Sequence, residues 1–181
     1  FIKALKNGYL LEIQEPTVIM QPGVLVGLNS LLEQSGSITL PTGEIIQRHP
    51  DTVVVITTNN NYAGCRDMNQ SVISRMNLIM DVEAPDVDTL AERTMKVTGC
   101  MDKTIVTDMA VSIQEISERC KETMINDGSC GVRELISWVQ SYMVCGDVLE
   151  AAKYTVLSSV SSDPENRADI QSSCLEQRFA A

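Results

Sequence analysis

The sequence predicts an α/β protein in which short strands alternate with helices up to about residue 84 and only helices follow. Val53-Val54-Val55-Ile56-Thr57-Thr58 is β-branched throughout, which is typical of a parallel-sheet strand that is buried on both faces. After Ala84-Pro85, apolar residues recur at helical spacing. Aromatic residues make up only 4% of the chain, so the core must consist of aliphatic side chains and methionine.

The first part of the chain alternates turn signals with short apolar runs. Asn7-Gly8 is a turn signal that precedes a strand, and Gln21-Pro22-Gly23 opens a helix that ends at Gly36. Two alternating runs on either side of Pro41-Thr42-Gly43 predict a β-hairpin. In chain order we expect a strand at 9–13, the helix, hairpin strands at 37–40 and 44–47, the strand at 53–58, a short helix near 69–75 and a strand at 77–82.

The second part of the chain contains only helical patterns. We expect helices near 86–99, 103–124, 131–145 and 147–160, with breaks at Asp127-Gly128-Ser129 and Gly146-Asp147. A tail rich in serine and charge follows; we expect one further helix after Pro164 and fraying ends. The expected organisation is an α/β part at 1–84, a helical domain at 85–160 and a polar C-terminal tail at 161–181.

Charge and cysteine content exclude some classes of function. The net charge of −10 argues against a dedicated nucleic-acid binder, which carries a basic stripe. The six cysteines show no CxxC spacing, which argues against a zinc site and favours buried thiols in a reducing cytoplasm. No apolar run reaches membrane-spanning length. Phe1 is not a start methionine, so we expect the chain to begin within a longer protein.

Polar residues stand where several of the expected elements begin or end. Glu15 follows the strand at 9–13 and Asn59 follows the strand at 53–58. Arg75 ends the short helix, and Arg133 opens the helix at 131–145. Ligands of open α/β sheets bind outside the carboxyl ends of the strands, where Glu15 and Asn59 are expected. In this order and spacing, roughly residues 8–145 resemble an AAA+ ATPase of the MoxR, CobS and midasin-like branch, from its Walker B strand through its helical lid.

The resemblance implies a fold and a role for the acidic segment. The fold would be the C-terminal part of a P-loop NTPase core followed by an α-helical lid. Leu10-Leu11-Glu12-Ile13-Gln14-Glu15 resembles the Walker B motif, in which Glu15 matches the residue that orients the attacking water. Gln14 stands where an aspartate on the magnesium side is expected, and Glu12 supplies that carboxylate only if it points toward the site. The alternative is that Glu15 only caps the end of a strand.

Three further segments resemble motifs of the same family. Thr57-Thr58-Asn59 resembles sensor 1, whose polar side chain contacts the γ-phosphate and water; the alternative is an asparagine that makes a turn. Ser74-Arg75-Met76 resembles the segment that carries the arginine finger, with Arg66 as a second candidate. Gly131-Val132-Arg133-Glu134-Leu135 resembles sensor 2, in which Arg133 would contact the nucleotide of its own subunit. For the three arginines, the alternative is a solvated surface charge.

The resemblance also implies substrate and partners. An AAA+ protein binds ATP and Mg²⁺, forms a homo-oligomeric ring, commonly of six subunits, and remodels a client protein, here unknown. No GxxxxGK[ST] loop occurs in the chain, so the phosphate-binding loop would lie upstream of Phe1 and residues 1–181 alone should not hydrolyse ATP. The strand that carries this loop would lie between the strands at 53–58 and 77–82. The alternative is a non-catalytic AAA+-like interaction module, which Gln14 favours.

Overall fold

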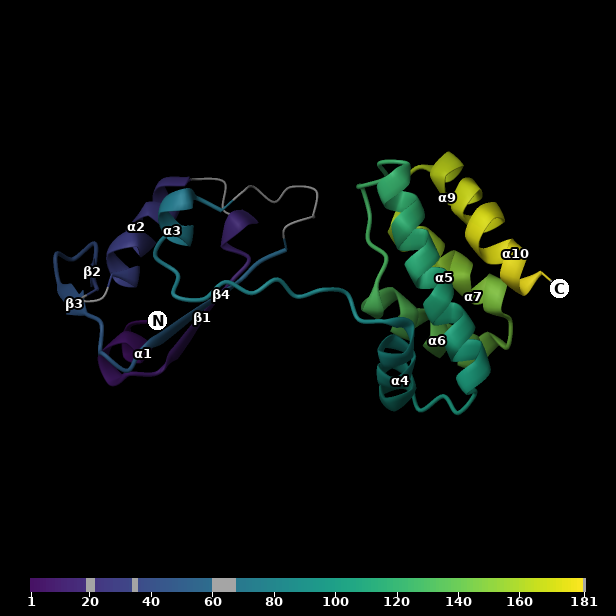
Figure 1. The fold of residues 1–181 in the computed structure, drawn as a ribbon, viewed down its shortest axis with the longest axis horizontal. Helices are drawn as coiled ribbons and strands as arrows, with labels where there is room; N and C mark the ends of the chain where they lie inside the picture. Colours follow the sequence, from purple (N-terminus) through teal and green to yellow (C-terminus); the bar gives the residue numbers. More distant parts are fainter. Residues whose placement is uncertain (19–21, 34–35, 60–67, 181) are drawn as a thin grey trace. The chain divides into compact units, whose positions relative to one another are not determined.

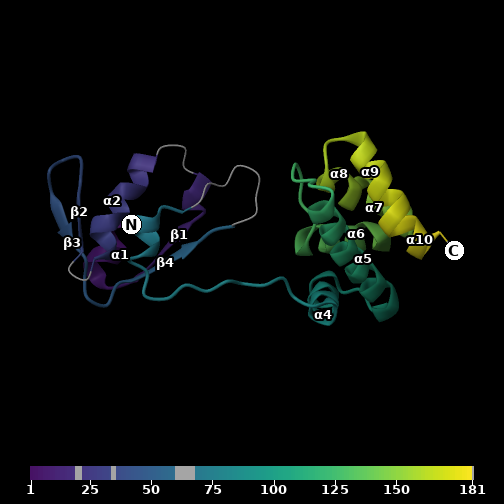
Figure 2. The same cartoon turned by 45° about the horizontal axis from the view of Figure 1, so that its top comes forward.

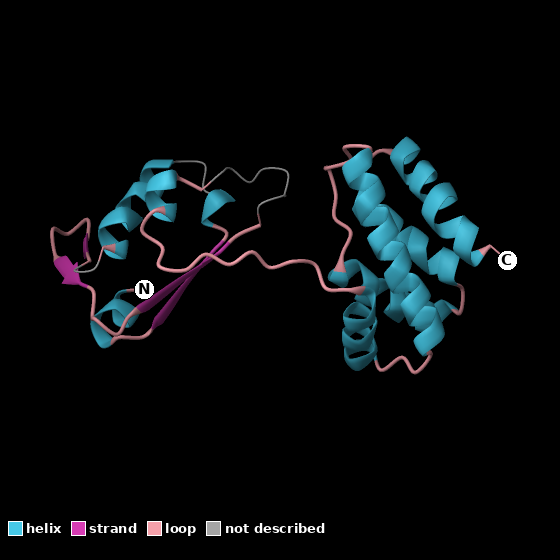
Figure 3. Ribbon diagram, in the orientation of Figure 1, coloured by secondary structure: helices cyan, strands magenta, loops and turns pink. Residues whose placement is uncertain are grey.

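The chain divides into two units, Phe1–Asp81 and Val82–Ala181. The computed structural model describes residues 1–18, 22–33, 36–59 and 68–180. Within these residues, every strand lies in the first unit, and the second unit is built from helices (Figure 3). The protein is therefore a mixed α/β protein, and its division lies three residues before the change at Ala84-Pro85 that the sequence indicates.

The first unit follows the expected order of elements with three differences: α1 and a 3₁₀ helix are additional, and the strand expected at 77–82 is missing. The described elements are α1 (Ile2–Asn7), β1 (Leu10–Gln14), the 3₁₀ helix η1 (Pro16–Val18), α2 (Pro22–Leu32), β2 (Ser37–Thr39), β3 (Ile45–Gln47), β4 (Val53–Thr57) and α3 (Gln70–Ile73) (Figure 1). β2 and β3 form the predicted antiparallel hairpin. β1 and β4 pair in parallel, with Leu11 opposite Val54 and Gln14 opposite Thr57.

The parallel pair β1–β4 buries only one of its faces. Leu11 belongs to a small core with Leu5, Leu31 and Ile46, and Val54 packs against that core. On the opposite face, Leu10 is 63% exposed and its partner Val53 is 55% exposed. The prediction that the β-branched run is buried on both faces is therefore wrong for the described structure, because no described element covers the second face.

The strand predicted at 77–82 is absent. The chain continues beyond α3 without regular structure until α4 begins, and Leu78, Met80 and Val82 are largely exposed. The prediction is wrong, because a strand-like apolar pattern forms a strand only where a neighbouring strand provides partners for its backbone hydrogen bonds. No described segment pairs with these residues.

Helix α1 was not predicted, although its end was visible in the sequence. Asn7-Gly8 is the C-terminal end of this helix rather than a simple turn. Gly8 has a φ of 73°, in the left-handed region, and its backbone N–H donates to the carbonyl oxygen of Ala4. A left-handed glycine is a common helix terminator, so the same dipeptide fits both interpretations.

The second unit is a bundle of helices around α5. Its elements are α4 (Val87–Thr98), α5 (Lys103–Glu122), α6 (Val132–Cys145), α7 (Val148–Tyr154), α8 (Val156–Val160), α9 (Pro164–Ile170), the π-helix η2 (Gln171–Leu175) and α10 (Glu176–Phe179). α5 packs against α4, α6 and η2. Figure 2 shows α4 and α6 next to α5. The four helices predicted between 86 and 160 are confirmed, except that the last is interrupted at Thr155 and becomes α7 and α8.

The C-terminal residues belong to the core of the helical unit. Ile170 and Leu175 are fully buried, and the ring of Phe179 contacts that of Trp138 edge-on at a centroid distance of 5.7 Å. The helix expected after Pro164 is present, but residues 161–181 are not a polar tail. The serine and charged residues occupy the outer side of these helices and obscured the buried positions Ile170, Cys174 and Leu175.

Candidate functional site

Polar side chains meet at the carboxyl ends of the two parallel strands. Glu15 follows β1, and its Oε2 accepts a hydrogen bond from the backbone N–H of Asn59, which lies just beyond β4, at 3.2 Å. The hydroxyl of Thr58 lies 3.5 Å from the same oxygen and 2.6 Å from the hydroxyl of Thr17. The structure therefore brings together Glu15 and Asn59, two of the residues that the sequence singled out.

The backbone of Glu15 adopts an uncommon conformation. Its φ of 49° lies in the left-handed region, which costs roughly 1–2 kcal/mol for a residue with a Cβ. The N–H of Glu15 donates to the carbonyl oxygen of Thr57 at 2.7 Å, and its own carbonyl accepts from Val18 at 3.2 Å. These bonds hold the turn that directs the carboxylate of Glu15 toward the end of β4. Strained residues held in this way are concentrated at functional sites.

The neighbouring positions of β1 give little support for a metal ion. Glu12 and Gln14 are exposed and lie on the same side of the strand, opposite Val55 and Thr57. Mg²⁺ in nucleotide sites is held by one or two carboxylates together with phosphate oxygens and water. Among the described residues, no three His, Cys, Asp or Glu side chains are grouped so that they could hold a metal ion. The donor set around Glu15 therefore does not form a Mg²⁺ site by itself.

Arg75 lies in the turn that follows α3. Its Nε donates to Oε1 of Glu33 at 2.6 Å, and its Nη1 donates to the carbonyl oxygen of Ser71 at 2.7 Å. Within the described structure, no hydrogen bond or ion pair connects Arg75 to Glu15 or Asn59. Arg75 therefore does not share the hydrogen-bonded cluster of Glu15.

Arg75 shares a pocket of about 390 Å³ with a second arginine, which the sequence analysis did not single out. Arg48 follows β3, and its Nη1 donates to the carbonyl oxygen of Leu31, at the end of α2, at 2.9 Å. Nothing in the sequence around Arg48 indicates that its side chain lies close to that of Arg75. The six residues that line the pocket are Leu32, Glu33, Arg48, Ser74, Arg75 and Asn77.

Arg133 belongs to the helical unit and lies in the first turn of α6. It is exposed, and no ion pair to it is present among the residues that the structure describes. Glu134, beside it, accepts hydrogen bonds from the N–H of Gly131 at 2.8 Å and from the hydroxyl of Ser129 at 3.0 Å. Glu134 thus stabilises the start of α6 and leaves Arg133 directed to solvent. Arg66, the second candidate for a finger, lies outside the described residues.

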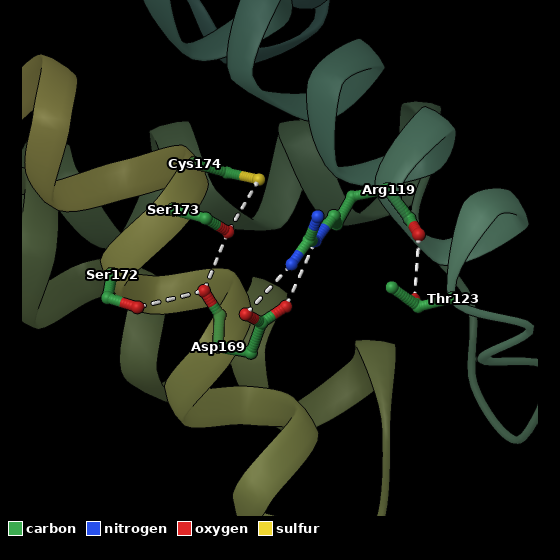
Figure 4. Close-up of polar contacts among 6 residues, drawn as sticks. All are labelled: Arg119, Thr123, Asp169, Ser172, Ser173 and Cys174. Atoms are coloured by element: carbon green, nitrogen blue, oxygen red, sulfur yellow. Dashed lines mark hydrogen bonds and ion pairs between the residues drawn. The ribbon is translucent and has the colours of Figure 1, made fainter.

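The helical unit contains a larger pocket, of about 580 Å³, between α5 and the segment η2–α10. Its two arginines are engaged in ion pairs. Arg119 binds both carboxylate oxygens of Asp169, at 3.0 and 3.1 Å (Figure 4). This pair lowers the pKa of Asp169 and raises that of Arg119. Arg178 donates to Glu115 at 2.6 Å. Because three glutamates line this pocket and both of its arginines are paired with carboxylates, it offers less to an anionic ligand than the pocket of Arg48 and Arg75, which is lined by one glutamate.

Two of the described cysteines are poorly suited to act as nucleophiles. Cys100, Cys120, Cys130, Cys145 and Cys174 are free thiols, and Cys65 lies outside the described residues. Burial raises the pKa of Cys130 and of Cys120, which disfavours the reactive thiolate.

No helix in the described part of the chain is long and apolar enough to cross a membrane.

Comparison with known proteins assigns no family. No family model matches the sequence. The chain is similar to an uncharacterized protein of Staphylococcus saprophyticus, with 24% identity over 168 residues, which cover 92% of this chain and 63% of the relative. The chain thus spans less than two thirds of the length of that relative. The description of the relative states no activity.

Proposed function

We propose that this chain is part of an AAA+ ATPase of the MoxR, CobS and midasin-like branch, which couples ATP hydrolysis to the remodelling of a partner protein in the cytoplasm. The observation that supports this most is the hydrogen bond between the carboxylate of Glu15 and the backbone N–H of Asn59, at the carboxyl ends of adjacent parallel strands. The proposal requires an acid and a sensor residue at these two positions, because both must reach the same γ-phosphate.

In this proposal Glu15 orients the water that attacks the γ-phosphate. Its Oε2 accepts hydrogen bonds from the backbone N–H of Asn59 and the hydroxyl of Thr58, which hold this oxygen at the end of β4. Oε1 has no hydrogen-bond partner among the described residues and would accept a proton from the attacking water molecule. The exposed side chain of Asn59 would bind the γ-phosphate or that water.

The two arginines would act on phosphate from different sides. Arg75 would reach the γ-phosphate that a neighbouring subunit holds, because it lies outside the cluster of Glu15. A guanidinium suits this role because it stays charged and binds phosphate oxygens in a fork. Arg133, exposed at the start of α6, would contact the nucleotide of its own subunit as sensor 2. A ring of six subunits would bring each Arg75 to the next site.

The remaining parts of the site would come from residues before Phe1. These would supply the phosphate-binding loop and the strand that carries it. The exposed face of β1–β4 and the exposed apolar residues at 78–82 are consistent with contacts to such a segment. Since the donors around Glu15 do not form a Mg²⁺ site by themselves, the proposal assigns no step to a metal ligand from residues 1–181.

A non-catalytic interaction module with the AAA+ shape is the second candidate. Gln14 favours it, because this amide occupies the position where the family has an aspartate and it cannot supply the same negative charge. The two candidates differ in a measurable way: only the first requires Glu15 to act on water.

Replacement of Glu15 by glutamine in the protein extended upstream of Phe1 tests the proposal. ATP turnover should fall by about 10²-fold or more while ATP binding persists, because the amide cannot accept the proton of water. Glu44→Gln is the matched control and should retain turnover. Glu44 is an exposed glutamate beside the hairpin and pairs with Lys6. Gln14→Asp should not lower turnover. Hydrolysis by Glu15→Gln at the parental rate would refute the role of Glu15.

A further inference from the structure

The pocket of Arg48 and Arg75 has more positive than negative side-chain charge. Two guanidinium groups and one carboxylate, that of Glu33, line it. The protein as a whole carries a net charge of −10. The net charge of the pocket lining is therefore opposite in sign to that of the protein. Among the described residues, the ion pair of Glu33 is with Arg75, at 2.6 Å. Among the described residues, no carboxylate forms an ion pair with Arg48.

Both arginines retain donors beyond their intramolecular bonds. Arg48 uses Nη1 for the carbonyl oxygen of Leu31, and Arg75 uses Nε and Nη1 for Glu33 and Ser71. In the described structure no partner is present for Nε and Nη2 of Arg48 or for Nη2 of Arg75. An oxyanion with several oxygens can bind two guanidinium groups at once, which suits phosphate groups better than a single carboxylate.

We infer that this pocket binds a polyphosphate group, that Arg48 is a second phosphate ligand beside Arg75, and that Glu33 competes with the phosphate for Arg75. The inference rests on the proposed function, since it takes the phosphate to be that of a nucleotide held by a second copy of the chain. In the absence of that copy, Glu33 holds Arg75 by the ion pair at 2.6 Å. When the neighbouring phosphate arrives, Arg75 exchanges the carboxylate for phosphate oxygens, and Arg48 contributes its unused donors.

Binding of inorganic tripolyphosphate to residues 1–181 tests the inference without a phosphate-binding loop or a ring. Calorimetric titration is done at low ionic strength and at a temperature where circular dichroism shows every variant folded. We expect saturable binding with a Kd on the order of 1 mM, because the pocket is open to water and Glu33 competes for Arg75. Arg48→Gln and Arg75→Gln should each weaken binding at least about fivefold, as expected for the loss of charge-assisted hydrogen bonds.

Glu33→Gln is the decisive variant because a gain in affinity cannot result from misfolding. Removal of the competing carboxylate should tighten binding about fivefold. Arg93→Gln, at an exposed arginine of α4, is the matched control and should bind like the parent. Citrate, a carboxylate anion of similar charge, should bind more weakly than tripolyphosphate.

Three outcomes would overturn the inference. The first is no saturable binding by the parent or by Glu33→Gln. The second is parental affinity in Arg48→Gln, Arg75→Gln or Glu33→Gln, and the third is equal affinity for citrate and tripolyphosphate. The proposed function fails separately, through the turnover of Glu15→Gln. If tripolyphosphate binds as expected but Glu15→Gln hydrolyses ATP at the parental rate, the pocket remains a phosphate site and the proposed ATPase function is rejected.

Discussion

The two units of the protein differ in how completely they bury their apolar residues. Among the described residues, the helical unit has a core cluster of nineteen buried residues, whereas the cluster in the α/β unit has four. Trp138 illustrates the first case: it is fully buried, and its Nε1 donates to the carbonyl oxygen of Val148 at 2.8 Å. Leu10 and Val53 illustrate the second, because both belong to a parallel strand pair and both are exposed.

The comparison indicates which unit depends on something further. Parallel sheets in proteins are covered on both faces, and a pair of strands alone is at best marginally stable. The helical unit satisfies its own helix ends, with Asp86, Asp102 and Asp147 accepting hydrogen bonds from the first turns of α4, α5 and α7. We infer that the helical unit is stable by itself and that the α/β unit gains stability from a partner or another segment of chain.

Thermal unfolding of residues 1–181 should separate the two units, which is the largest effect we expect. The α/β unit should melt more than about 10 °C below the helical unit, since a difference of about 2 kcal/mol shifts the midpoint by that amount in domains of this size. The single tryptophan, Trp138, reports only on the helical unit, and far-ultraviolet circular dichroism reports on both. One transition seen identically by both probes would contradict the comparison.

Gly128→Ala should destabilise the helical unit specifically. An added Cβ at this position would overlap the carbonyl groups of Ser159 and Val160, which belong to backbone and cannot rotate away. Overpacking of this kind costs typically 1–3 kcal/mol. The midpoint of the tryptophan signal should fall, and the transition of the α/β unit should not move. Gly131→Ala, where an added Cβ has room, is the control.

Acid should weaken the helical unit in part through Asp127. Hydrogen bonds from the side chain and backbone of Ser162, and from Ser161, lower the pKa of Asp127 from 3.8 to about 2. Because the folded pKa lies below the unfolded one, this stabilisation is present above about pH 4 and is lost as the pH falls toward 2. The free energy of unfolding is measured with urea and Trp138 fluorescence. Between about pH 4 and pH 2 it should fall less in Asp127→Asn than in the parent protein. An equal loss of unfolding free energy in the parent and in Asp127→Asn would contradict this role of Asp127.

The sequence predicted best those features that depend on neighbouring residues. Asp147 before α7 and Gly99 after α4 mark helix ends by local hydrogen bonding, and the hairpin follows from its turn and alternation. The prediction of a strand at 77–82 is wrong because the local pattern is strand-like, whereas strand formation depends on a pairing partner, and no described segment pairs with these residues. Helices α9 and α10 were underestimated because composition obscured their buried positions.

The same distinction holds for the candidate site. That Glu15 and Asn59 lie close together follows from the rule that parallel strands share one carboxyl edge, and the structure shows it. The pairing of Arg75 with Glu33 joins residues 42 positions apart, and no local signal connects them. Arg48 was missed for the same reason. The contacts of Arg48 and Arg75 depend on how the helices pack against the hairpin. The spacing of residues along the sequence does not indicate this packing.

Mixing two inactive variants tests the central claim, that Glu15 and Arg75 complete a hydrolytic site across two subunits. Glu15→Gln and Arg75→Ala are each prepared in the protein extended upstream of Phe1, and ATP turnover is measured for each alone and after subunit exchange. Arg75→Ala alone should lose about 10³-fold in turnover, as for other arginine fingers.

In a random equal mixture, roughly a quarter of the interfaces in a ring pair an intact Glu15 with an intact Arg75 from the neighbour. If Arg75 acts in trans, turnover should therefore partly return on mixing, well above the sum of the two separate variants. If both residues serve the same subunit, no mixed ring contains a complete site. Turnover that stays at the level of the separate variants, in rings shown to have exchanged subunits, would contradict the account.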